Sequence, residues 1–152
     1  MNLHLRVLIV EDSEDDMLLM LRSLRRGGYI LEHARVDTLS TMQAALERQN
    51  WDVVIADYTL PAFSAPEALE LLQSQGRDLP FIIVSGTIGE ELAVAAMKAG
   101  AHDYLIKGNL PRLLPAVERE FREAKERDKR RHAERSLRES QERIRIQASE
   151  LS

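Results

Sequence analysis

The sequence contains no cysteine, and this absence removes several classes of function at once. A chain without thiols forms no disulfide framework, offers no thiolate ligand to a metal ion and has no cysteine nucleophile. The same absence fits a reducing compartment, and we expect a cytoplasmic protein.

Long apolar runs are also missing. The N-terminal stretch MNLHLRVLIVEDSEDD is interrupted by His4 and Arg6 and then runs directly into acidic residues. A secretory signal has an uninterrupted apolar centre, and a membrane-spanning helix needs about 20 consecutive apolar residues. We therefore expect neither a signal peptide nor a membrane anchor in this stretch.

Charge is distributed unevenly along the chain. Residues 1–111 contain 9 basic and 16 acidic residues, a net charge of −7, whereas residues 112–152 contain 12 and 9, a net charge of +3. The basic segment alternates in sign, so its excess is too weak to indicate a nucleic-acid surface. Its uninterrupted helical pattern also leaves no turn for a helix-turn-helix motif.

Short apolar runs, mostly β-branched, alternate with helical patterns. The runs are Leu5–Val10, Trp51–Ala56, Pro80–Val84 and Asp103–Ile106, and a fifth candidate, Tyr29–Val36, has the charged alternation of a sheet edge. Strands joined through helices by short connections imply right-handed crossovers and a parallel sheet covered on both faces. We predict an α/β fold: a doubly wound, five-stranded parallel sheet in the flavodoxin-like order 2-1-3-4-5, with an extended C-terminal helix.

The last segment is predicted to be one long helix, because no glycine occurs from Leu110 onward and no proline after Pro115. On its otherwise charged surface a seven-residue repeat, typical of a coiled coil, is formed by Leu137, Ile144 and Leu151. We expect a domain of residues 1–123 and an extended helix or coiled-coil linker of residues 124–152. The linker could pair two copies into a homodimer; a frayed, solvent-exposed helix is the alternative.

Carboxylates follow two of the predicted strands at one edge of the sheet. Glu11 and Asp12 come after the first strand, and Asp57 comes after the third. Carboxylates brought together repel one another unless a cation or a proton lies between them. Magnesium prefers oxygen ligands and commonly takes one or two carboxylates, so the pattern predicts a site for Mg²⁺ (or Mn²⁺).

Two further side chains complete this edge, since Ser85 follows the fourth strand and Lys107 the fifth. Phosphoryl transfer needs an in-line nucleophile and positive charge on the transferred oxygens. Asp57 is the candidate nucleophile, while the metal and Lys107 would neutralise charge. The Ser85 hydroxyl and the Gly86 amide could donate hydrogen bonds to phosphoryl oxygens. Each residue alone could be a helix cap or a surface side chain, but the whole set favours phosphoryl chemistry.

Four motifs occur in the order LIVEDSEDD, VVIADYTLP, FIIVSGT and AGAHDYLIK, across roughly residues 4–123. In this respect the sequence resembles the receiver domains of bacterial two-component response regulators. The stretch GTIGEELAVAAMKAG looks like the version found in receivers attached to PAS or histidine kinase modules. The tail LRESQERIRIQASEL resembles the linker helix that precedes a PAS domain, so we expect a fragment of a longer protein.

The resemblance implies that Asp57 is the phosphoacceptor, fed by the phosphohistidine of a sensor histidine kinase or a phosphotransfer protein. Glu11 and Asp12 would form the acidic metal pair, and Thr59 would add its backbone carbonyl. Glu11 stands where the family often has Asp, so its longer side chain is expected to act through water. No enzyme activity is implied beyond the protein's own phosphotransfer and slow dephosphorylation.

By the same resemblance Lys107 is the phosphate-binding lysine, Ser85 the switch hydroxyl and Tyr104 the switch aromatic. A phosphoryl group adds about −1.5 to −2 charge at Asp57, which would draw Ser85 toward it and leave space for the Tyr104 ring. The changed surface would then signal to an output module. The alternative for Tyr104 is ordinary packing.

Three other functions fit the same fold less well. A phosphatase of the haloacid dehalogenase type needs a second acid two residues after the nucleophile, where this chain has Thr59. A flavin-binding protein needs a phosphate-cradling loop after the first strand, whereas EDSEDD is strongly acidic. A non-phosphorylated, receiver-like dimerisation or scaffold module remains the main alternative, although all the charged residues of the active type are present.

Overall fold

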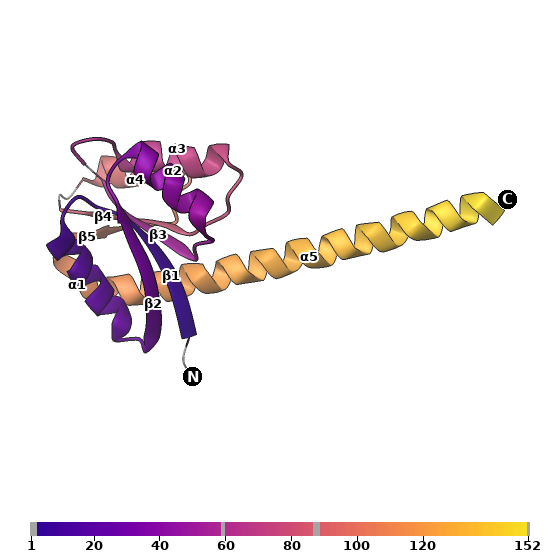
Figure 1. Cartoon of the computed structure of the whole chain (residues 1–152), viewed down its shortest axis with the longest axis horizontal. Coiled ribbons are helices and arrows are strands. Elements are labelled where there is room, and N and C mark those ends of the chain that lie inside the picture. The colour runs from indigo at the N-terminus through magenta and orange to yellow at the C-terminus, as the bar shows by residue number, and fades with distance from the viewer. Residues whose placement is uncertain (1–2, 59, 87–88, 152) are drawn as a thin grey trace. The chain divides into compact units, whose positions relative to one another are not determined.

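The computed structural model describes residues 3–58, 60–86 and 89–151. Five parallel strands form one sheet in the order β2-β1-β3-β4-β5 (Figure 1). Their bounds are β1 Leu3–Val10, β2 Tyr29–Val36, β3 Val53–Asp57, β4 Phe81–Ser85 and β5 Asp103–Ile106. The predicted sheet and strand order are confirmed, and β2 lies at the edge, as its charged alternation indicated.

Helices cover both faces of the sheet, as Figure 1 shows for α2, α3 and α4 on one face and α1 on the other. Their bounds are α1 Glu14–Arg25, α2 Leu39–Arg48, α3 Ala65–Ser74, α4 Glu90–Ala99 and α5 Leu113–Leu151, with a short 3₁₀ helix, η1, at Lys107–Arg112. Alternate residues of the central strands point to opposite faces and form two separate apolar clusters. One cluster packs against α2 and α3, and the other against α1 and the first turn of α5.

The helices begin where side chains cap them. Ser13, Thr38 and Ser64 each accept a hydrogen bond from a backbone N–H in the first turn of α1, α2 and α3. At the other end of α4, Gly100 has φ of 117°, a left-handed conformation that favours glycine. These signals keep the loops short, so that the carboxyl ends of β1, β3, β4 and β5 meet at one edge.

Three strands differ from the sequence-based bounds: β1 begins two residues earlier than expected, at Leu3, and β3 and β4 are shifted toward the C-terminus. Trp51 lies before β3, because its indole N–H donates to the Ala45 carbonyl at 2.9 Å and its ring joins the core beside α2. Pro80 lies before β4, since proline has no N–H to donate to the ladder, although its carbonyl accepts from Val54. Asp57 and Ser85 are consequently the last residues of their strands.

The chain forms two compact units, residues 1–121 and residues 122–152. The first contains the sheet, α1 to α4, η1 and the beginning of α5. The second is a single helical stretch whose large apolar side chains are exposed at Leu137, Ile144, Ile146 and Leu151. The domain boundary expected at residues 123 and 124 stays a prediction. Within the described ranges, each helix is too short or too polar to cross a membrane.

Candidate functional site

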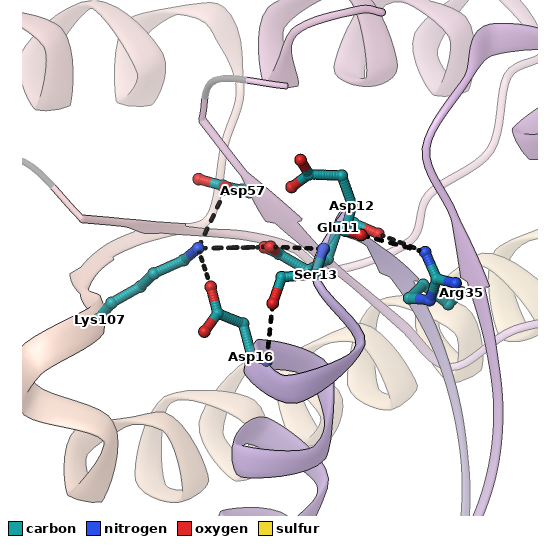
Figure 2. A network of polar contacts seen from close by, with 7 residues as sticks. All are labelled: Glu11, Asp12, Ser13, Asp16, Arg35, Asp57 and Lys107. Atoms are coloured by element: carbon teal, nitrogen blue, oxygen red, sulfur yellow. Dashed lines mark hydrogen bonds and ion pairs between the residues drawn. The ribbon is translucent and has the colours of Figure 1, made fainter. Parts of the chain in front are cut away.

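Three carboxylates meet where β1 and β3 end side by side. Oxygen atoms of Glu11, Asp12 and Asp57 lie within 4.8 Å of one another. Glu11 is 1% exposed, Asp57 is half-buried and Asp12 is exposed to solvent (Figure 2). The parallel pairing of β1 with β3 brings these residues together, as the sequence predicted.

Lys107 reaches this cluster from the end of β5 (Figure 2). Its Nζ lies 3.1 Å from Asp57 Oδ2, 3.2 Å from Glu11 Oε2 and 2.7 Å from Asp16 Oδ2. Burial lowers the pKa of Lys107, but its hydrogen bonds to Asp16 and Asp57 and the nearby negative charges outweigh burial and raise the pKa. The ammonium is therefore a permanent positive charge at this edge.

The carboxyl group of Glu11 has a raised pKa. Burial, and next the negative charge of Asp57, raise the pKa of Glu11 to about 7, although Lys107 and the Ser13 N–H act to lower it. Among the described residues, no hydrogen bond is directed at the buried oxygen Oε2 of Glu11. A buried, under-satisfied carboxylate beside two other acids is a place where added positive charge is favourable.

The loop that carries the acidic pair is tied at two points. The Ser13 N–H donates to Glu11 Oε1 at 3.2 Å, which fixes the side chain of Glu11. Arg35, near the end of β2, donates through Nη1 to the backbone carbonyls of Glu11 and Asp12, both at 3.4 Å (Figure 2). These contacts hold the two acids at the edge of the sheet.

Ser85, Gly86 and Tyr104 lie at the same edge of the sheet or close to it. Ser85 is 3% exposed at the end of β4, next to β3, and Gly86 follows it with open space on its Cα. Tyr104, in β5, packs its ring against that of Tyr58, with centroids 6.3 Å apart and a tilt of 57°. Within the described part of the chain, the Tyr104 hydroxyl is buried without a hydrogen-bond partner. Thr59 lies outside the described residues.

Two residues that the sequence analysis did not single out belong to this arrangement. Asp16 makes the shortest contact to Lys107, and Arg35 supports the backbone of the acidic pair. Asp16 falls in the first turn of α1, where acids are common because they interact with the helix dipole. No other feature of the sequence pointed to Asp16.

The donor set suits a hard divalent cation. It offers carboxylate oxygens only, one of them buried without a hydrogen bond, and one acid, Asp12, open to solvent. Magnesium prefers such oxygen ligands and keeps several of its own waters, which the exposed side of the cluster leaves room for. The residues therefore fit the ion that their sequence pattern predicted.

Fold and acidic edge together define a receiver-type α/β protein, and comparison with known proteins agrees. A family model described as the response regulator receiver domain matches residues 7–118, more than half of the chain. The chain belongs to this family. No helix-turn-helix accompanies the receiver among the described residues, where only one helix follows residue 112.

Relatives and solved structures support the same assignment. The transcriptional regulatory protein PrrA of Mycobacterium tuberculosis is 30% identical over 67% of this chain and 43% of its own length. For the response regulator protein FleR of Pseudomonas aeruginosa the identity is also 30%, over 67% of this chain and 21% of FleR. The chain thus spans less than half the length of these relatives.

Among solved structures, the signal receiver domain of a protein described as a Luxo repressor, from Vibrio parahaemolyticus, superposes with a TM-score of 0.72. It is 30% identical, over 83% of this chain and 96% of that domain. The beryllofluoride-activated NtrC4 receiver domain dimer gives a TM-score of 0.68 at 25% identity, over 78% of this chain and 98% of that one.

Proposed function

We propose that this receiver domain accepts a phosphoryl group on Asp57 from the phosphohistidine of a sensor histidine kinase or a phosphotransfer protein. The observation that carries the proposal is the pairing of Asp57 Oδ2 with Lys107 Nζ at 3.1 Å, beside two further carboxylates suited to a divalent cation. A nucleophile, a fixed cation and a metal-type donor set are what phosphoryl transfer requires.

The proposed reaction transfers one phosphoryl group from an imidazole nitrogen of the donor to a carboxylate oxygen of Asp57. A lone pair of an Asp57 carboxylate oxygen forms the new O–P bond, while the P–N bond to the donor imidazole breaks and its electron pair stays on nitrogen. Lys107 directs its ammonium at the oxygens on which charge accumulates, and the Ser85 hydroxyl and the Gly86 amide donate hydrogen bonds to them. Slow hydrolysis of the acyl phosphate would return the resting state, and no other enzyme activity is proposed.

Mg²⁺, or Mn²⁺ in its place, would be held by Asp12 and Asp57 directly and by Glu11 through water. When bound, the ion supplies positive charge to the transferred phosphoryl oxygens. An indirect role for Glu11 is supported by its burial and by the hydrogen bonds that its Oε1 accepts from the Ser13 N–H and from Lys107 Nζ. The backbone carbonyl of Thr59 as a further ligand stays a prediction.

Phosphorylation is proposed to change the surface formed by α4 and β5. The added charge would draw Ser85 toward Asp57, and Tyr104 would turn its ring into the space so left. Two features of Tyr104 support mobility: its buried hydroxyl lacks a partner among the described residues, and it lines a surface pocket together with Ala93 and Ile106. The altered surface would signal to an output module.

We further propose that residues 1–123 act as the receiver and residues 124–152 as an extended linker. The linker's heptad positions, Leu137, Ile144 and Leu151, are 59%, 64% and 89% exposed, which supports pairing with a second copy in a coiled coil. A cytoplasmic location is proposed because the phosphoryl donors depend on ATP.

The test is intact-mass spectrometry after incubation with acetyl phosphate and Mg²⁺. The proposal expects a gain of about 80 Da, one phosphoryl group, that requires Mg²⁺ and is absent in Asp57→Ala. If neither acetyl phosphate nor a panel of phosphorylated histidine-containing donors modifies the protein, the non-phosphorylated dimerisation or scaffold module is the better description.

A further inference from the structure

Lys107 has a partner that the phosphoacceptor chemistry does not require. Its Nζ donates to Asp16 Oδ2 at 2.7 Å, a shorter contact than its hydrogen bonds to Asp57 Oδ2 at 3.1 Å and to Glu11 Oε1 at 3.4 Å (Figure 2). An ammonium has three N–H donors, and charge-assisted hydrogen bonds shorten as they strengthen. In the unphosphorylated protein all three donors therefore face carboxylates, and the shortest contact is to Asp16.

The position of Asp16 is built by the loop that also carries the metal pair. Its backbone N–H donates to the Ser13 hydroxyl at 3.2 Å, and the Ser13 N–H in turn donates to Glu11 Oε1 at 3.2 Å. This capping arrangement sets the first turn of α1 so that Asp16 points toward Lys107, as Figure 2 shows. The two preceding acids of that turn, Glu14 and Asp15, are exposed, whereas Asp16 is 38% exposed.

A phosphoryl group on Asp57 changes the demand on Lys107. It brings about −1.5 to −2 charge and three strong acceptor oxygens to the place where Asp57 Oδ2 now meets the ammonium. The Asp16 carboxylate contacts the same ammonium from the α1 side. An N–H group of Lys107 that stays bonded to Asp16 is not available to the phosphoryl group. The negative charge of Asp16 also repels the incoming anion.

We propose that Asp16 is a positioning residue that competes with a phosphoryl group on Asp57 for Lys107 and so weakens the hold of the site on that group. The inference rests on the proposed phosphoacceptor function and deepens it. Of the three acids in the first turn of α1, this role falls to Asp16, which contacts Lys107.

The probe for the test is beryllofluoride, a non-transferable phosphoryl analogue, titrated into the full chain with saturating Mg²⁺ and followed by amide NMR shifts. Asp16→Asn removes the competing charge, and Asp16→Glu restores a carboxylate. Asp15→Asn is the matched control, since it makes the same change of charge one residue earlier at an exposed position. Thermal unfolding of each variant verifies the fold.

Competition for Lys107 predicts that Asp16→Asn binds beryllofluoride about fivefold more tightly than wild type, the effect expected for one partly exposed charge. Asp16→Glu should return to near the wild-type affinity, and Asp15→Asn should match wild type. The rate of phosphorylation by acetyl phosphate should rise in Asp16→Asn but not in Asp15→Asn.

Two results would overturn the inference while the phosphoacceptor function stands. Unchanged or weaker beryllofluoride binding in Asp16→Asn would mean that Asp16 anchors Lys107 or merely caps the helix. An equal gain in Asp15→Asn would mean a general charge effect. A wild-type protein that neither binds beryllofluoride nor becomes phosphorylated on Asp57 would instead refute the proposed function, and the inference with it.

Discussion

Glu11 makes the metal-free protein less stable as the pH rises, and this effect can be worked out from the site. Burial and the charge of Asp57 raise the pKa of Glu11 from 4.5 to about 7. A carboxyl group whose pKa is raised by folding is protonated in the native state over a range where it is ionised in the unfolded state. Its contribution to stability is therefore fully present below pH 4.5 and is lost as the pH rises to about 7.

The size of this loss follows from the shift. At about 1.4 kcal/mol per pKa unit, ionising Glu11 in the folded protein costs roughly 3 kcal/mol of unfolding free energy. For a chain of this length that loss lowers the melting temperature by roughly 5–10 °C. The conversion is reasonable for this side chain because Glu11 is 1% exposed, so solvent does not screen it.

The assay is thermal unfolding by circular dichroism in EDTA, at pH values from 5 to 8, for wild type and Glu11→Gln. The difference between the two proteins isolates Glu11, because every other titratable group is common to both. Glu14→Gln, at an exposed position of the first turn of α1, is the control. The reasoning would be refuted if the melting temperatures of wild type and Glu11→Gln changed in parallel with pH.

Three other predictions concern the charged residues around Asp57 and the C-terminal part of α5. Adding Mg²⁺ at pH 8 should raise the melting temperature of wild type, and Asp12→Asn should remove most of the gain, because the exposed Asp12 is a proposed direct ligand of the ion. Lys107→Gln should lower the unfolding free energy by about 1–3 kcal/mol at pH 7, since three carboxylates lose their shared cation; calorimetry or urea unfolding measures this. Sedimentation should show self-association in wild type that Ile144→Lys abolishes, whereas no self-association in either protein would contradict the coiled-coil proposal.

The fold could be predicted because its signals are local. Buried β-branched runs, capping residues and short connections each indicate one element, and the handedness of parallel crossovers then leaves few topologies. The exact strand ends could not be predicted, because Trp51 is apolar enough to belong to β3 but joins the core through its bond to Ala45. Tertiary packing, which the sequence does not display, decides such boundaries.

The candidate site was predictable to the extent that it lies at strand ends. A parallel sheet places the residues that follow or end its strands at one edge, so Asp57, Glu11 and Lys107 had to converge. Contacts that start from a helix turn or from a neighbouring strand could not be foreseen in the same way. Asp16 and Arg35 reach the site through side-chain direction, which depends on how α1 and β2 are seated.

The choice of glutamate at residue 11 ties these observations together. Its side chain is long enough for one oxygen to accept the Ser13 N–H while the other lies 3.2 Å from Lys107. The hydrogen bond from the Ser13 N–H ties the side chain of Glu11 to the loop that carries Asp12 and leads to Asp16. We therefore expect Glu11 to position the charged residues around Asp57, and the proposed direct ligands of the cation remain Asp12 and Asp57.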